Sequence, residues 1–219
     1  MKVHIATGLV LITLFSVLAV SAQVKEITKD EYYSPWRAAI QKARGLNRRK
    51  ISKTEIYKNG KISATDEWLY EYVLPDKIRY VHLEKRDGKS YRTEQVDIDK
   101  LKYCKQDDKP WELVEGPCIG GGAGGVPNAQ SIKYTVETVR SGNNDAKLFT
   151  QYITFKDPFT KESNIGLSFY ESKYWLGSDG FIIREERKYG LAETKRIDRL
   201  TVDTYEYNPK DLMIEAPIK

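Results

Sequence analysis

An apolar segment at the start of the chain stands apart from everything after it. Lys2 precedes residues 9–20, which are almost all Leu, Val, Ile, Phe and Ala, and small residues follow. This is the pattern of a secretory signal peptide with cleavage after Ala22. A membrane anchor fits less well, because the run is shorter than a bilayer requires. We therefore expect residues 1–22 to be a signal peptide and residues 23–219 to form one domain.

A helical pattern follows. Ser34 and Pro35 favour a helix start, because Ser caps free N–H groups and Pro has no N–H to lose. Gly45 is placed to end the helix, and Thr28 with Glu31 matches a capping box for a short earlier turn. The apolar face of this helix, predicted to lie on another surface, contains Trp36, Ala39, Ile40 and Ala43.

From residue 51 onward the hydrophobic pattern alternates with a period of about two, which is typical of strands. The pairs Asn59-Gly60 and Asp87-Gly88 are strong hairpin signals. We predict strands at 51–58, 62–74, 77–85, 89–96, 101–104, 111–114, 132–140, 148–155, 165–171, 173–176, 181–188 and 194–207, and a short piece at 212–215. About ten strands and one helix predict an α+β fold that is mainly antiparallel β. The expected architecture is a curved open half-barrel lidded by the N-terminal amphipathic helix.

The two cysteines lie on either side of a short loop. In an exported protein Cys104 and Cys118 are expected to form a structural disulfide, since the compartment is oxidising and the spacing is not that of a redox motif. Glycines at 120, 122 and 125 match a dinucleotide-binding spacing, but Pro127 and a further strand follow instead of a helix. We interpret Gly120 to Gly125 as a surface loop that could gate a site.

Composition and charge exclude some classes of protein. The 219 residues include 36 Lys and Arg against 31 Asp and Glu, and 40% are hydrophobic. Such a chain is not disordered, and no basic block indicates nucleic-acid binding.

Catalytic patterns are weak. His82 is the only histidine after the predicted signal peptide, so no multi-histidine metal site is expected and no metal is assigned. Carboxylate pairs such as Glu67 with Glu71 or Glu185 with Glu186 occur in almost any chain with this many acids. We expect neither an enzyme nor a bound cofactor.

Aromatic side chains are frequent on the predicted strands. A packed sandwich core would explain them. Alternatively, a single curved sheet has a concave face that one helix cannot fill, and the remaining apolar space would accept a lipid chain. The residues expected to line such a cavity are Trp68, Tyr70, Tyr72, Tyr80, Phe155, Leu167, Phe169, Trp175 and Ile183.

The order of these features resembles the LolA/LolB-like lipoprotein-carrier superfamily of the bacterial periplasm. The matching segments are the helix and polar strand at 36–57, the aromatic strand and proline at 68–80, the Asp-Gly hairpin at 179–186, the long strand at 197–207 and the last piece at 212–217. The resemblance covers nearly all of residues 23–219. It implies a half-closed barrel with helices over its concave side and lipid tails inside.

Two functional hypotheses follow. The first is a monomeric periplasmic or secreted carrier or sensor that binds a lipid or lipoprotein acyl chain. The helix moves aside, and the chain is exchanged with a membrane-bound donor or acceptor protein. The second is a secreted envelope adaptor or signalling module with a packed sheet, which binds another protein through its surface.

Overall fold

The computed structural model describes residues 23–116, 118, 129–141, 144–161 and 165–218. The predicted signal peptide and the Gly120 to Gly125 loop lie outside these residues. The described chain is mainly antiparallel β with one helix, in a curved open sheet that does not close into a barrel. This confirms the predicted fold class.

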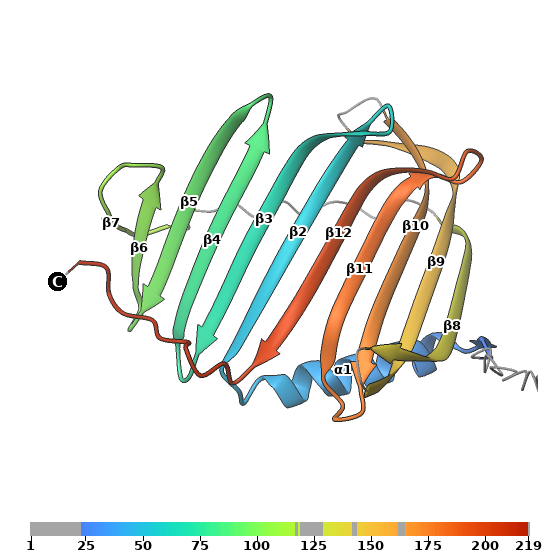
Figure 1. Cartoon of the computed structure of the whole chain (residues 1–219), viewed down its shortest axis with the longest axis horizontal. Coiled ribbons are helices and arrows are strands. Elements are labelled where there is room, and N and C mark those ends of the chain that lie inside the picture. Colours follow the sequence, from blue (N-terminus) through green and yellow to red (C-terminus); the bar gives the residue numbers. More distant parts are fainter. Residues whose placement is uncertain (1–22, 117, 119–128, 142–143, 162–164, 219) are drawn as a thin grey trace, which may run out of the picture.

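In the described residues the sheet contains twelve strands, and Figure 1 shows how they are arranged. In chain order they are β1 (Lys25–Glu26), β2 (Arg48–Lys58), β3 (Lys61–Val73), β4 (Lys77–Arg86), β5 (Lys89–Ile98), β6 (Leu101–Gln106), β7 (Glu112–Val114), β8 (Ala129–Ser141), β9 (Asn144–Lys161), β10 (Ile165–Gly177), β11 (Ile182–Leu191) and β12 (Arg196–Tyr207). Their spatial order is β1-β8-β9-β10-β11-β12-β2-β3-β4-β5-β6-β7, so the C-terminal strand β12 joins the two halves by pairing with β2.

Turn chemistry explains the hairpins. Asn59 and Gly60 have φ of 52° and 73°, and Asp87 and Gly88 have the same values. Two consecutive residues with positive φ give a turn whose twist matches that of the flanking strands, and Asn-Gly and Asp-Gly adopt it at low cost. Both predicted hairpins are confirmed.

Helix α1 (Lys29–Ala43), the one helix among the described residues, begins earlier than Ser34. Thr28 is the N-cap, its hydroxyl accepting from the Glu31 N–H at 3.2 Å while its own N–H donates to the Glu31 carboxylate at 2.7 Å. The predicted start at Ser34-Pro35 is therefore wrong. The capping box at Thr28 satisfies the free N–H groups six residues before Ser34, and Pro35 lies inside the helix.

Two strand predictions are also corrected. Residues 165–171 and 173–176 form one continuous strand, β10, because Ser172 keeps its pairing with both Gln151 and Arg187. The piece at 212–215 is not a strand. It lies irregularly, yet Leu212 and Ile214 are buried, and Ile214 packs on Val96 and Tyr103 at the far end of the sheet.

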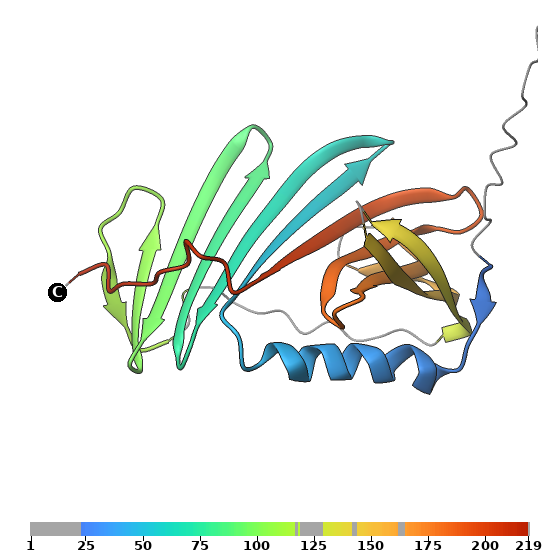
Figure 2. The same cartoon turned by 60° about the horizontal axis from the view of Figure 1, so that its bottom comes forward.

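Helix α1 lies along the β8–β12 half of the sheet, which curves around it (Figures 1 and 2). The main core forms there from Tyr32, Ala39, Phe149, Tyr174 and Ile182. We call the side of the sheet that carries Phe149 and Tyr174 the helix face, and the opposite side the outer face.

Candidate functional site

One register row shows how far the helix face extends. Tyr174 pairs with Glu185, Glu185 with Asp203, Asp203 with Ser52, Ser52 with Trp68, and Trp68 with His82. Directly paired residues point to the same side of a sheet. Trp68 and His82, on strands beyond the helix, therefore share the face on which α1 packs.

The next rows bring more aromatic rings to this side. Tyr205, Lys50, Tyr70 and Tyr80 form one row, and Tyr207, Arg48, Tyr72 and Ile78 form another. We call Trp68, Tyr70, Tyr72 and Tyr80 the aromatic row. The Trp68 and Tyr70 rings stack at 5.7 Å, and Tyr70 meets Tyr80 edge to face at 5.5 Å. Four of the nine residues predicted to line a cavity thus lie together.

A cleft of about 270 Å³ opens beside these rings. It is lined by Arg48, Lys50, Tyr70, Glu71, Tyr72, Ile78, Tyr80 and Tyr205. Arg48 lies over the Tyr72 ring at 4.3 Å and Lys50 over the Tyr70 ring at 4.6 Å. The two cations therefore make cation–π contacts along one side of an otherwise mostly aromatic cleft.

Lys50 is also held by a buried carboxylate. Asp203 is only 1% exposed and forms ion pairs with Arg187 at 2.7 Å and with Lys50 at 3.6 Å. Because Asp203 lies between the helix core and the cleft, this network gives the middle of the helix face a polar character. An apolar guest would therefore meet rings on β3 and β4 and charged groups on β2 and β12.

The tyrosines near the cleft stay protonated. Burial raises the pKa of Tyr70 and Tyr80, and it raises the pKa of Tyr207 to about 12. Their hydroxyls are thus neutral at physiological pH. They can donate a hydrogen bond to a ligand oxygen and do not supply a nucleophile.

Side chains fill the space between α1 and the sheet itself. The Phe149 and Tyr174 rings stack at 4.7 Å, and the Tyr174 hydroxyl donates to the Tyr32 carbonyl. Trp36 Nε1 donates to Glu185 Oε1 at 2.9 Å, and Tyr205 donates to the other oxygen of the same carboxylate at 2.7 Å. In this arrangement α1 is fastened by both rings and hydrogen bonds.

The predicted lid residues occupy this contact. Trp36 and Ile40 pack against the main core, Ala39 belongs to it, and Ala43 is buried. At the end of the helix, Arg48 donates to the Ala43 carbonyl at 3.2 Å. The cleft thus begins close to where α1 stops.

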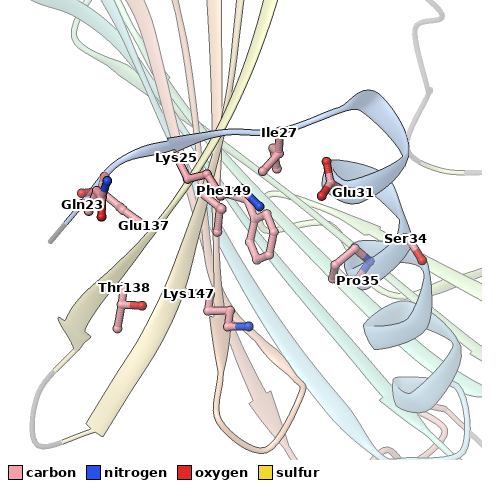
Figure 3. A pocket seen from close by; sticks show the side chains of 11 residues that line it. Gln23, Lys25, Ile27, Glu31, Ser34, Pro35, Glu137, Thr138, Lys147 and Phe149 are labelled. Carbon is pink, nitrogen blue, oxygen red and sulfur yellow. The ribbon is translucent and has the colours of Figure 1, made fainter.

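A second hollow, of about 510 Å³, lies at the other end of α1 (Figure 3). Its lining includes Lys25, Glu31, Glu137 and Lys147, and Phe149 forms its apolar floor. Both signs of charge and mostly exposed residues make it a solvated groove at the sheet edge. Of the two hollows, the cleft beside the aromatic row fits an apolar guest better.

The other predicted lining residues are placed differently. Phe169 stacks on Tyr152 at 5.7 Å and Trp175 lies under Arg184 at 5.5 Å, and both are on the outer face, opposite their neighbours Tyr170 and Tyr174. Ile183 sits at the bulge where the pairing passes from Arg184 to Ile182.

Two more predicted lining residues lie on β9 and β10, away from the cleft. Phe155 is buried on β9. Leu167 lies on β10, but its side chain is outside the described part of the structure. The structure therefore brings the β3 and β4 members together and does not bring all nine to one cavity.

Sequence reasoning missed Arg48, Lys50 and Tyr205. The basic run at 48–50 is typical of a polar entry to a strand, and the predicted strand starts only at residue 51. Extending it back by three residues would have put Arg48 and Lys50 on the same side as Ser52. That Tyr205 joins them depends on the pairing of β12 with β2, which no local pattern shows.

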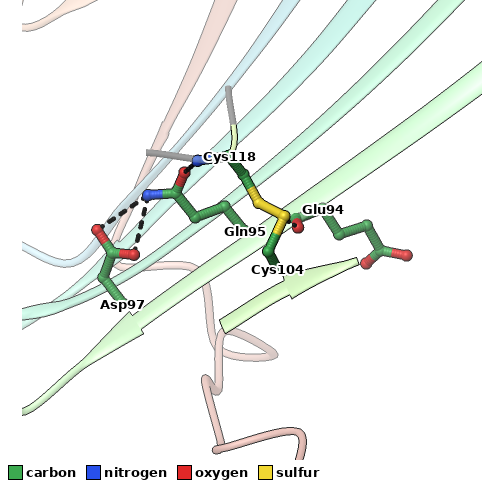
Figure 4. Close-up of a disulfide and its surroundings, with 5 residues drawn as sticks. All are labelled: Glu94, Gln95, Asp97, Cys104 and Cys118. Carbon is green, nitrogen blue, oxygen red and sulfur yellow. Dashed lines mark hydrogen bonds between the residues drawn. A yellow bond between two sulfur atoms is a disulfide. The ribbon is translucent and has the colours of Figure 1, made fainter. Parts of the chain in front are cut away.

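The predicted disulfide is confirmed (Figure 4). Cys104 on β6 is bonded to Cys118, and the Cys118 N–H donates to Gln95 Oε1 at 3.1 Å. Gln95 in turn donates to both oxygens of Asp97, at 2.9 and 3.2 Å. The cross-link therefore fastens the chain after β7 to β5 and β6, on the row that also contains Tyr80.

His82 is the one histidine among the described residues. His82 stacks on Trp68 at 4.0 Å, and its Nε2 lies 3.5 Å from Asp66 without a hydrogen bond. Within residues 23–116, 118, 129–141, 144–161 and 165–218, no group of three metal-ligating side chains converges. No helix in that same part of the chain is long and apolar enough to cross a membrane.

Comparisons with known proteins give distant structural likenesses only. The chain matches no protein-family model and no curated protein sequence. Among solved structures it is similar to the crystal structure of LprF from Mycobacterium bovis, at 11% identity and a TM-score of 0.45, over 85% of this chain and 97% of that chain. So distant a likeness says nothing about ligand, partner or activity.

Proposed function

We propose that this chain is a binding protein and not an enzyme, and that it holds the acyl chain of a lipid or lipoprotein between α1 and the aromatic row. The observation that carries the proposal is the extent of the helix face. Helix α1 packs on β8, β9 and β11, whereas the same face continues to the half-buried rings on β3 and β4 with an open cleft beside them. An apolar surface of this kind gains free energy when a guest covers it.

The energetics favour a long alkyl chain over a small polar ligand. Each buried CH₂ contributes about 0.8 kcal/mol. A cleft of about 270 Å³ covers only part of such a chain. The remainder would have to pass beneath α1, so binding requires the helix to move aside.

Helix α1 is the proposed lid. The contacts that must break include the Trp36–Glu185 hydrogen bond and the hydrogen bond from the Tyr174 hydroxyl to the Tyr32 carbonyl. The packing of Tyr32, Ala39 and Ile40 on the main core must also be released. These contacts lie on the sheet side of the helix, so α1 can leave as one body. Ala43 at its end would act as the pivot, next to the Arg48 contact.

The cations give the cleft one charged side and one apolar side. Arg48 and Lys50 border it, so the polar end of a lipid would lie there and the apolar tail would run along the rings. The tyrosine hydroxyls add neutral donors for ester oxygens. This polarity supports an amphiphilic ligand over a pure hydrocarbon.

The disulfide supports a location outside the reducing cytoplasm, in the periplasm or after secretion. Together with a carried lipid this implies a membrane-bound donor or acceptor as partner, and we propose a monomeric carrier.

The test is a fluorescence titration of delipidated protein with a fluorescently labelled long-chain fatty acid. We expect saturable binding that Tyr80→Ser weakens at least about fivefold, since the ring contributes one apolar contact surface. The matched control is Tyr152→Ser, which removes a half-buried tyrosine from the outer face. Absence of saturable binding, or an equal effect of both substitutions, contradicts the proposal.

Native mass spectrometry of the purified protein distinguishes the carrier from the adaptor. A carrier retains a lipid that adds a discrete mass and is released by organic solvent. An adaptor with a packed sheet shows the bare polypeptide mass before and after extraction.

A further inference from the structure

Two hairpin turns reach the end of the sheet opposite α1 (Figure 1). They connect β2 to β3 and β4 to β5, and they are neighbours because β3 pairs with β4, Ala64 lying opposite Arg86. Every residue from 58 to 63 and from 85 to 92 is exposed. The two turns thus form one projecting, solvent-facing edge.

Like charges face each other on both turns. Lys58 is the cross-strand partner of Lys61, and Arg86 is the partner of Lys89. Directly opposed like charges destabilise a hairpin, and the turn residues Asn-Gly and Asp-Gly need no basic neighbours. The repulsion between these like charges therefore destabilises both hairpins. An anion bound from outside would relieve it.

The carboxylates nearby do not neutralise the edge. Glu84 pairs with Arg86 at 3.0 Å, and Asp107 accepts from the Arg92 N–H at 2.8 Å, so both are engaged within the fold. Asp87 lies in the turn itself. Lys58, Lys61, Lys85 and Lys89 keep their charge directed at solvent without an ion pair in the described part of the chain.

Apolar side chains stand beside these cations. Ile62 is 53% exposed, and Tyr91, next to the second turn, is 47% exposed. This combination of lysines with an exposed aliphatic and an exposed aromatic side chain is complementary to the interface of a lipid bilayer. There the ammonium groups contact lipid phosphates, and the apolar side chains reach the boundary of the acyl chains. An acidic protein surface would use the charges but would leave Ile62 and Tyr91 without a partner.

We propose that this edge docks on an anionic lipid bilayer, with Lys58, Lys61, Lys85 and Lys89 on the lipid phosphates and Ile62 and Tyr91 inserted between headgroups. Docking here leaves α1 and the cleft on the side away from the headgroups. This docking edge is a different surface from the acyl-chain site. Docking is measured on vesicles, whereas acyl-chain binding is measured with a soluble probe, so each can fail without the other.

The experiment is co-sedimentation of the full processed chain with phosphatidylcholine vesicles that do or do not contain phosphatidylglycerol. We expect binding only to the anionic vesicles, and its loss at about 0.5 M salt through screening. The double variant Lys58→Gln with Lys61→Gln should bind about 25-fold more weakly, given the contribution of each basic residue near an anionic surface.

The matched control is Lys29→Gln with Lys210→Gln, which removes two exposed lysines away from the turns. This variant has the same net charge as the test variant and should bind at least several-fold more tightly than it. Ile62→Ser with Tyr91→Ser should weaken binding while leaving its salt dependence unchanged. Equal loss in both lysine variants, or no binding to anionic vesicles at low salt, overturns the proposal.

Discussion

Trp36 and Glu185 are joined by a hydrogen bond of 2.9 Å that fastens α1 to β11. The same carboxylate accepts from Tyr205, so one acidic group connects the helix to the two strands that lead towards the cleft. These hydrogen bonds and the packing of rings around Tyr32 together hold α1 on the sheet.

Loss of that bond should loosen the helix. We expect Trp36→Phe to lower the free energy of unfolding by about 1.5 to 3 kcal/mol, because the substitution removes a hydrogen bond to a charged group and leaves the ring position filled. Chemical denaturation of both proteins measures this difference in the free energy of unfolding. Trp175→Phe on the outer face is the control, and an equal loss there would assign the effect to ring size instead.

Gly190 cannot carry a side chain. A Cβ at this position would lie 1.8 Å from the Arg196 carbonyl oxygen and 2.9 Å from the Phe169 ring, so backbone would have to move. We expect Gly190→Ala to cost about 3 kcal/mol, as overpacking of a well-filled site does. Gly45→Ala, with no atom within 4 Å, should leave the thermal midpoint nearly unchanged. A tolerated Gly190→Ala would disprove the close approach of β11 and β12.

Acid should weaken the outer face through Glu94. Burial raises the pKa of this carboxyl, but the hydrogen bonds and charges of Arg92 and Arg79 outweigh it, and the folded pKa lies below its ordinary value of 4.5. A lowered folded pKa stabilises the protein above the unfolded pKa, and this contribution is lost as pH falls through the folded one. We expect the free energy of unfolding to decline from about pH 4.5 downward.

The variant Glu94→Gln should show less of this decline, measured by urea denaturation at several pH values. Glu112→Gln, at an exposed position on β7, is the control and should behave like the unmodified chain. A steeper acid decline in Glu94→Gln would contradict the assignment.

The disulfide should contribute to stability and not to ligand binding. Replacing Cys104 and Cys118 together by Ser should lower the free energy of unfolding by about 3 kcal/mol, since the bond restricts a short loop in the unfolded chain. The oxidised protein should show no thiol reaction until it is denatured and reduced. An unchanged midpoint in the double Ser variant would show that the unfolded chain is already restricted there.

Local chemistry explains the features that the sequence predicted correctly. Asn59-Gly60 and Asp87-Gly88 favour their turns through the positive φ of adjacent residues, whatever the strands pack against. The helical spacing of Trp36, Ala39 and Ile40 likewise predicts one buried stripe. With only two cysteines in the sequence, Cys104–Cys118 is the one pairing possible within the chain.

Long-range contacts decided the rest. Alternation correctly placed Trp68, Tyr70 and Tyr72 on one side of their own strand, but it cannot say which side of β10 meets them. The predicted lining takes Phe169 and Trp175 from the wrong side of this strand, because both lie on the outer face. The bulges after Leu167 and after Trp175 each shift the pairing, and a shift of one residue turns a strand over.

The helix start shows the same division. The capping box at Thr28 and the Pro35 signal compete in the sequence, and the burial of Tyr32 against Phe149 and Tyr174 favours the longer helix. By itself the sequence determined turns, periodicity and the cross-link, because these depend on neighbours along the chain. Only the tertiary structure decided which faces meet and where the cleft opens, because strand pairing between distant segments sets both.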